Sequence, residues 1–557
     1  MNDSLINIVI NNKKTIRVNK NTTIKEIILN NADVCEYKII GAKIQNEIVD
    51  FNMPLNKDTN ITLFDIEDLD GYKMTQGGLK FVLEVALKEN FGDGVEVNYN
   101  HSIGNGIHTT IKNIDHFSKS DVAKLKKCMD KLIEEDIKIE KLNILSKEVS
   151  NFFSRNKLNE KASNVHNLYN NIINLYKLKK YYNYFYVLMP YSTSYLNDFE
   201  LVYIDDKELA LVLPTNHTFN LVEYKNYDGI TKCFKDTFNI LDKYNLRYIS
   251  DINAAVSKGY SKEIIKLFET YFNNQIYECA KKIINNKSKY VLIAGPSSSG
   301  KTTTSKKIYL NLKSLGREAF LISTDDYFVN LEDTPKKEDG TYDFESIKSV
   351  DIEKLNQDIK DLSEGKEVLL PIYNFKTGKR EYSNKPIKLK KDPIILIEGI
   401  HSLNDELTPY IGKDEKYKIY LSPFMGIKID RHNYLSTTDL RLIRRIIRDN
   451  NNRATNVDKT IELWKSVRDG EERNIFPYIK QANLIINTAL PYELGVLRVF
   501  AIPLLYSVDN NSPYIEEARR LLRYLEYIYP ISSEYVVDDS IIREFIGGSV
   551  FKREGDI

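Results

Sequence analysis

The chain has 557 residues, a net charge of +1 and hydrophobic residues at 42% of its positions. This length predicts roughly three to four domains, and the composition is typical of an ordinary globular protein. The small net charge excludes a polycation, so a nucleic-acid surface would have to be a local patch. No apolar run is long enough to span a membrane and the first residues lack a signal-peptide pattern, so we expect a cytoplasmic protein. Four separate cysteines are expected to be reduced thiols: Cys35, Cys128, Cys233 and Cys279.

Residues 1–66 predict a small unit of strands with one helix. Alternating apolar residues at 6–10 and 15–18 flank an Asn-Asn-Lys turn, which indicates a hairpin. Thr23 and Glu26 have the spacing of a capping box before an apolar run, which predicts a helix start. Further short strands are expected at 39–40, 48–49 and 61–64. This order is typical of a ubiquitin-like β-grasp domain, and it resembles the TGS module at the front of threonyl-tRNA synthetases and some GTPases.

Residues 67–225 predict a mixed α+β region. Helices are expected at 78–89 and 120–135, and strands at 96–99 and 109–111. The order resembles the second additional domain of threonyl-tRNA synthetases, in which an H-x-x-x-H motif serves the editing of mischarged tRNA. The matching stretch, 72–77, holds no histidine. His101, His108 and His217 are expected to be structural or exposed rather than ligands, so the resemblance implies an editing scaffold without its chemistry.

Helices are expected on both sides of the central motif region. Residues 226–285 predict a helical connector, because apolar residues recur at helical spacing between 261 and 284. Residues 491–557 predict a C-terminal helical segment. Its ending at 541–549 is expected to be a packing or dimer segment.

A phosphate-binding loop lies between a strand pattern and a helix pattern. Gly295, Gly300, Lys301 and Thr302 match G-x-x-x-x-G-K-[ST] in full. An apolar strand is expected directly before the loop, and a helix at 305–315 after it. Lys301 would neutralise the β- and γ-phosphates, and the Thr302 hydroxyl would join a Mg²⁺ shell. The sequence therefore predicts ATP binding by Gly295, Pro296, Ser297, Ser298, Ser299, Gly300, Lys301, Thr302 and Thr303.

Two further strand patterns end in carboxylates. Asp325 and Asp326 follow an apolar run that begins at Phe320, and Glu398 ends the run that begins at Pro393. Open α/β sheets place active residues at the carboxyl ends of their strands. Beside a phosphate loop, Glu398 and Thr302 would hold Mg²⁺ or its waters. Together these motifs predict a phosphotransferase cleft.

The order of motifs over residues 286–490 resembles the uridine kinase/phosphoribulokinase family, which implies an α/β P-loop kinase domain with a parallel sheet. The matching blocks are the phosphate loop, Asp325-Asp326-Tyr327-Phe328, Thr341-Tyr342-Asp343-Phe344, Pro371-Ile372-Tyr373-Asn374-Phe375, Glu398-Gly399-Ile400 and the arginine-rich run 441–449. With residues 1–285, the whole chain resembles bacterial nucleoside kinases that carry a threonyl-tRNA synthetase-like N-terminal half.

The resemblance implies roles for several residues in a 5′-hydroxyl nucleoside kinase that uses ATP and Mg²⁺. Asp325 is the expected general base, and Asp343 would accept hydrogen bonds from vicinal ribose hydroxyls. Arg441, Arg445 and Arg448 fall at i, i+4 and i+7, so one helix face is expected to form a lid over the phosphates. The catalytic set is Asp325, Lys301, Arg445 and Arg448. The acceptor-binding set is Asp343, Tyr373, Phe375, Arg380 and Arg453.

Two departures from the family pattern leave the acceptor open. The histidine that usually follows the Y-D-F segment is absent after Phe375, and the usual R-G-R is Arg453-Ala454-Thr455. A pocket without a hydrogen-bonding partner discriminates poorly between bases. The alternatives are a kinase of another small hydroxyl compound, as in phosphoribulokinase, and an RNA-associated regulatory NTPase whose N-terminal half binds RNA.

Overall fold

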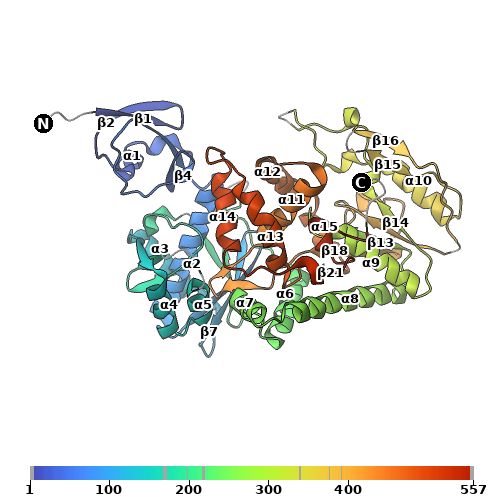
Figure 1. Cartoon of the computed structure of the whole chain (residues 1–557), viewed down its shortest axis with the longest axis horizontal. Coiled ribbons are helices and arrows are strands. Elements are labelled where there is room, and N and C mark those ends of the chain that lie inside the picture. Colours follow the sequence, from blue (N-terminus) through green and yellow to red (C-terminus); the bar gives the residue numbers. More distant parts are fainter. Residues whose placement is uncertain are drawn as a thin grey trace.

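The computed structural model describes residues 5–551 apart from 167, 169–171, 197, 216–219, 338–339, 375–376 and 391. The molecule is elongated, and the N-terminal sheet lies at one end of its long axis (Figure 1). The strands β15 (Pro371–Asn374) and β16 (Lys379–Tyr382) lie toward the other end, and the C-terminal helices α13 (Glu493–Tyr506) and α14 (Ile515–Leu525) lie between the two. Within the described ranges, no helix has the length and apolar character that crossing a membrane requires.

The N-terminal unit is a mixed five-stranded sheet with one helix. Its elements are β1 (Leu5–Ile10), β2 (Lys14–Asn19), α1 (Ile24–Asn30), β3 (Gly41–Ile44), β4 (Glu47–Ile48) and β5 (Thr59–Phe64). The strand order is β2-β1-β5-β3-β4, and β1 pairs with β5 in parallel. The capping box is confirmed, because the Glu26 backbone N–H donates to Thr23 Oγ1 at 3.3 Å and the Thr23 backbone N–H to Glu26 Oε2 at 2.7 Å. The prediction of a strand at 39–40 is wrong, because β3 begins only at Gly41.

In its described residues, the second region has two antiparallel sheets and four helices. Its elements are α2 (Leu69–Phe91), β6 (Glu96–Ile103), β7 (Gly106–Lys112), α3 (Lys119–Glu134), β8 (Glu140–Leu145), α4 (Ser146–Arg155), α5 (Asn159–His166), β9 (Ile172–Leu178), β10 (Tyr181–Asn183), β11 (Glu200–Asp205) and β12 (Glu208–Val212). The strand orders are β11-β12-β7-β6 and β10-β9-β8. His101 and His108 face each other across β6 and β7 with ring centroids 4.6 Å apart, and both are buried. The two rings therefore pack together inside the domain, whereas His217 lies outside the described residues.

The C-terminal half is built on a five-stranded parallel sheet. Its elements are β13 (Tyr290–Ala294), α9 (Lys301–Ser314), β14 (Ala319–Ser323), α10 (Ile352–Ser363), β15 (Pro371–Asn374), β16 (Lys379–Tyr382), β17 (Ile394–Glu398), β18 (Lys416–Ser422), β19 (Lys428–Asp430), β20 (Asn433–Tyr434), α11 (Thr437–Arg453), α12 (Val457–Asn474) and β21 (Leu484–Asn487). The strand order is β14-β17-β13-β18-β21, and every neighbouring pair is parallel. The carboxyl ends of β13, β14 and β17 therefore meet at one edge.

Helices outside the sheet share its hydrophobic core. They are α6 (Asp228–Lys243), α7 (Ile249–Ser257), α8 (Ser261–Asn285), α13 (Glu493–Tyr506), α14 (Ile515–Leu525) and the short α15 (Arg543–Ile546). One buried cluster runs from α8 through the strands of the sheet to α13 and α14. The expected helices at 226–285 are thus present and pack against the five-stranded sheet. The four cysteines are free thiols, as expected.

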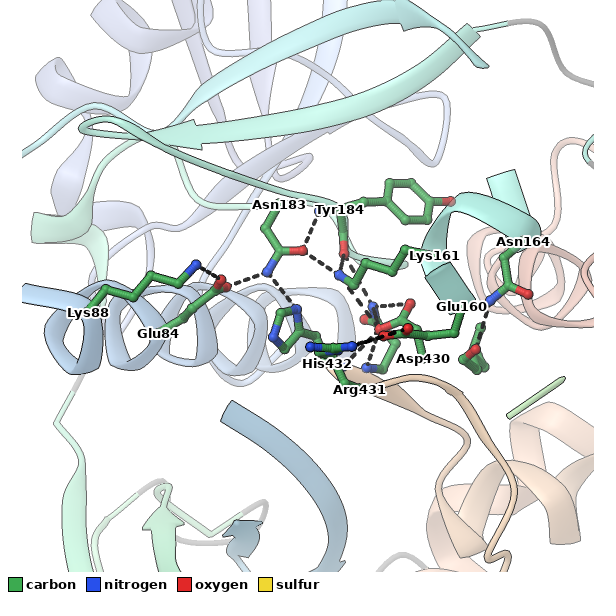
Figure 2. A network of polar contacts seen from close by, with 12 residues as sticks. Glu84, Lys88, Glu160, Lys161, Asn164, Asn183, Tyr184, Asp430, Arg431 and His432 are labelled. Carbon is green, nitrogen blue, oxygen red and sulfur yellow. Dashed lines mark hydrogen bonds and ion pairs between the residues drawn. The ribbon is translucent and has the colours of Figure 1, made fainter. Parts of the chain in front are cut away.

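A buried polar cluster joins the N-terminal half to the β19–β20 hairpin (Figure 2). We call it the hairpin cluster, and its members are Glu84, Lys161, Asn183, Asp430 and His432. Lys161 Nζ lies 3.6 Å from Asp430 Oδ1, and both side chains are at most 1% exposed. Asn183 Nδ2 lies 2.8 Å from His432 Nδ1 and also donates to Glu84. Burial raises the pKa of Asp430 and lowers the pKa of Lys161, which is the expected direction for charges removed from water.

Candidate active site

The phosphate loop lies at the centre of the sheet's carboxyl edge, between the end of β13 and the start of α9. Gly300 is the N-cap of α9 and has a φ of 81°, a left-handed conformation that favours glycine. At Gly295 a Cβ atom would lie 2.4 Å from the Leu421 carbonyl oxygen, so only glycine fits against β18. The local chain therefore has the backbone that the motif predicted, although α9 begins at Lys301 rather than at residue 305.

The loop presents donors that suit an anion. The first backbone N–H groups of α9 have no partner within the helix, and the helix dipole favours negative charge there. In the described part of the chain, the buried hydroxyls of Ser298 and Ser299 have no hydrogen-bond partner. Lys301 Nζ donates to the Pro296 carbonyl at 3.2 Å, a bond that a phosphate oxygen can replace. This donor set fits the phosphate chain of a nucleoside triphosphate.

Oxygen ligands lie beside the loop. Thr302 Oγ1 donates to Glu398 Oε1 at 3.3 Å, and Glu398 is 4% exposed at the end of β17. Asp325 lies in the short 3₁₀ turn Thr324–Tyr327 that follows β14. Among the described residues, no group of three or more His, Cys, Asp or Glu side chains could hold a metal by itself. A hydroxyl and a carboxylate fit Mg²⁺, which keeps several waters and binds substrate phosphates.

The arginines of α11 bind the phosphate loop from its backbone side. Arg441 Nε donates to the Ser297 carbonyl at 2.8 Å, and Arg445 Nη1 donates to Ser297 Oγ at 3.1 Å. Arg441 is 1% exposed and forms an ion pair with Glu471, whose Oε1 also accepts the Ser297 backbone N–H at 3.2 Å. Arg448 pairs with Asp449 at 3.1 Å. Two of the three predicted arginines, Arg441 and Arg445, are therefore packed against the loop and hold its shape, whereas Arg448 pairs within its own helix.

One arginine of this helix was missed by the sequence analysis. Arg444 is fully buried, donates from Nη1 to the Ser298 carbonyl at 3.3 Å, and pairs with Glu493 at 2.7 Å. Arg444 is not on the helix face that the i, i+4, i+7 spacing of Arg441, Arg445 and Arg448 predicted. Neither its burial nor its partner on α13 can be deduced from periodicity, because Glu493 belongs to an element outside the motif region.

The expected acceptor residues occupy different surroundings. The Asp343 Oδ1 atom is buried and has no hydrogen-bond partner within the described ranges. Tyr373 is 5% exposed, and its ring meets Phe328 edge-on with centroids 5.5 Å apart. Arg380 Nη1 donates to Asp351 Oδ2 at 2.6 Å, and Arg453 lies 3.5 Å from Asp449 in the last turn of α11. Phe375 lies outside the described residues.

Two titratable groups of the site were also missed. His401, three residues after Glu398, is 1% exposed; burial lowers its pKa to about 4, against the opposing effects of Asp325 and Asp343. Burial, and then Glu471, raise the pKa of Glu345 to about 7, while Arg445 and Lys301 act in the opposite direction. Glu345 therefore lies within electrostatic reach of Lys301 and Asp325, and His401 lies within electrostatic reach of Asp325 and Asp343. The sequence signal was a histidine directly after the Glu-Gly-Ile block and a glutamate two residues after Asp343.

A parallel sheet, a complete phosphate loop and carboxylates at the adjacent strand ends define the class of this protein as a P-loop kinase. The model of the phosphoribulokinase/uridine kinase family matches residues 291–492. The uridine kinase of Macrococcus caseolyticus is 32% identical over 203 residues, which are 36% of this chain and 88% of that protein. The chain belongs to the phosphoribulokinase/uridine kinase family, and its substrate is a small hydroxyl compound.

A second curated relative and one solved structure are similar to this chain over a comparable share of its length. The uridine kinase of Bacillus pumilus is 31% identical over 196 residues, which are 35% of this chain and 83% of that protein. The solved structure of a possible uridine kinase from Bacillus stearothermophilus is 19% identical, with a TM-score of 0.27, and covers 38% of this chain and 98% of its own. The elements from β1 to α8 lie before the residues that the family model matches.

Proposed function

We propose that this chain transfers the γ-phosphoryl group of ATP to the 5′-hydroxyl of a nucleoside, with uridine and cytidine as the first candidates. The observation that carries the proposal is a pair of carboxylates, Asp325 and Asp343, within electrostatic reach of the same buried side chain, His401. Both carboxylates act on His401, and Asp325 also acts on Glu345, on which Lys301 of the loop acts as well. One carboxylate is then available for the attacking hydroxyl and the other for the ribose diol. The relatives named uridine kinase support a nucleoside acceptor.

The proposal assigns a role to each candidate residue. Asp325 would accept the proton of the 5′-hydroxyl as that oxygen attacks the γ-phosphorus in line. Lys301 would bind the β- and γ-phosphate oxygens, and Arg445 and Arg448 would stabilise the charge that develops there. Thr302 and Glu398 would hold Mg²⁺, which supplies charge neutralisation between the phosphates. The acceptor would also be bound by the other residues of its set, which are Tyr373, Phe375, Arg380 and Arg453.

For the N-terminal half we propose a β-grasp domain of the TGS type (1–66), followed by a region similar to the second additional domain of threonyl-tRNA synthetases (67–225). The strand order β2-β1-β5-β3-β4 with its parallel β1–β5 pair supports the first assignment. Binding of RNA by this half, and self-association of the chain, remain parts of the proposal. The helical connector (226–285), the kinase domain (286–490) and the C-terminal helical segment (491–557) complete the proposed organisation.

The test is an ATP-consumption assay with Mg²⁺ over a panel of nucleosides, ribulose 5-phosphate and other small alcohols, with the products identified by mass. A nucleoside-dependent rate that yields a 5′-monophosphate is the expected result. Phosphorylation of a sugar phosphate alone would reassign the acceptor within the family. A slow rate of ATP hydrolysis that does not depend on any acceptor, but that increases when RNA is added, would indicate a regulatory NTPase instead.

A further inference from the structure

The last described part of the chain, residues 536–551, packs directly against the nucleotide site; we call it the C-terminal segment. Ile541, Ile542 and Phe545 are fully buried, so the segment is an integral part of the fold. Lys307 of α9 pairs with Asp539, and Asn451 Nδ2 of α11 donates to the Phe545 carbonyl at 3.1 Å. The segment therefore touches both helices that shape the phosphate loop.

Two contacts bring the segment to the loop itself. A Cβ atom at Gly300 would lie 2.8 Å from Ile541 Cγ2, so the segment is packed against the N-cap of α9. The Arg444 guanidinium, which holds the Ser298 carbonyl, lies 4.9 Å from the centroid of the Phe545 ring. The family model matches residues 291–492, so these contacts come from a part of the chain beyond that region.

A carboxylate of the segment engages a hydroxyl of the loop motif. Thr303 Oγ1 donates to Glu544 Oε2 at 2.9 Å, and Thr303 is the residue after Lys301 and Thr302 in the first turn of α9. A hydroxyl has a single proton, so while it donates to Glu544 it cannot donate to a phosphate oxygen. Within the described ranges, Glu544 forms no ion pair with Lys, Arg or His, so its charge is not neutralised by a salt bridge.

We propose that Glu544 competes with the bound nucleotide for Thr303 and thereby sets the affinity of the donor site. This inference rests on the proposal that the loop binds ATP. A phosphate oxygen bound to the Thr303 hydroxyl would lie about 5 Å from the carboxylate, as two hydrogen bonds in succession allow. Two negative charges at that separation repel each other even in a water-rich site. Nucleotide binding therefore requires the Thr303 hydroxyl to exchange partners against this repulsion.

The experiment measures the Kd of Mg-ATP by calorimetry for the full chain without acceptor. The variants are Glu544→Gln, which keeps an acceptor atom and removes the charge, and Glu544→Ala. Both are expected to tighten ATP binding about three- to tenfold, because the repulsion is lost. Glu534→Gln makes the same chemical change at an exposed position nearby and is expected to leave the Kd unchanged.

A second readout separates this role from a structural one. The KM for ATP is expected to fall in Glu544→Gln while the KM for the acceptor stays at the wild-type value, and raised ionic strength should reduce the difference. A loss of packing would weaken ATP binding, so an unchanged or larger Kd in Glu544→Gln overturns the inference. If the wild-type chain binds no ATP, the proposed function is overturned as well. If the wild type and Glu544→Gln bind ATP with the same low Kd, only this inference is overturned.

Discussion

The hairpin cluster and the phosphate loop both bury polar groups, but the polar groups of the two regions are hydrogen-bonded to different degrees. In the hairpin cluster, Lys161 pairs with Asp430 and donates to Asn183 and to the Tyr184 carbonyl. In the loop, the Ser298 and Ser299 hydroxyls have no hydrogen-bond partner in the part of the chain that the structure describes. The comparison teaches that a buried charge by itself does not mark a site. In the loop, the unsatisfied hydroxyls coincide with a complete phosphate-binding motif, and the two features together mark the site.

Removing the lysine of the loop is the largest expected change. Lys301→Ala should lower kcat at least about a thousandfold, because the charge on the transferred phosphoryl group loses its main cation. The melting temperature should stay within a few degrees of wild type, since Lys301 is not part of a satisfied buried network. Lys313→Ala, at the exposed end of α9, is the control. Turnover close to wild type in Lys301→Ala would contradict the assignment of the loop.

Removing the proposed base should affect turnover and spare donor binding. Asp325→Asn is expected to lower kcat about a hundred- to a thousandfold, with the Kd of ATP unchanged, because the amide cannot accept the hydroxyl proton. Single-turnover kinetics and calorimetry measure the two quantities. Asp326→Asn, one residue further on, should lose less than about tenfold. Equal rates for Asp325→Asn and the wild type would remove Asp325 as the base.

Breaking the hairpin cluster should lower the stability of the fold and leave turnover unchanged. Lys161→Met leaves the Asp430 carboxylate buried without its cation, and we expect the free energy of unfolding to fall by about 3–5 kcal/mol. The kcat of the folded fraction should be unchanged, because the cluster provides no group to the phosphate loop. Urea titration and a steady-state assay test the two expectations, with the exposed Lys147→Met as control. A stable variant that has lost its turnover would make the cluster part of the active site.

A pH-dependent difference should be the smallest effect. Burial raises the pKa of Glu345 to about 7 from its ordinary 4.5. Between pH 4.5 and pH 7, the folded chain therefore keeps a proton on Glu345 that the unfolded chain releases. Stability from this group therefore falls as the pH rises from 4.5 to 7. Between pH 5 and 7, wild type should lose about 1–2 kcal/mol more unfolding free energy than Glu345→Gln. The exposed Glu353→Gln should follow wild type, and equal slopes in all three chains would refute this assignment.

Local patterns predicted local structure well in both halves of the molecule. The β1–β2 hairpin, the Thr23–Glu26 capping box and the strand–loop–helix unit around Gly300 all depend on residues close together in the chain. The boundaries were less accurate, as the later start of β3 shows, because pairing with β5 decides where that strand begins. The contacts of Arg444 with Glu493 and of Thr303 with Glu544 had no local signal at all.

The sequence by itself determined that this chain has a phosphate-binding loop and that carboxylates stand at the ends of neighbouring strands. It did so because a phosphate loop is a short motif whose backbone and side chains act together without distant help. Only the tertiary structure decided which groups surround that loop. Arg441 and Arg444 hold its carbonyls, Glu544 engages Thr303 from far along the chain, and Asp430 binds the N-terminal half. These contacts depend on packing between distant segments, and periodicity does not encode which segments will meet.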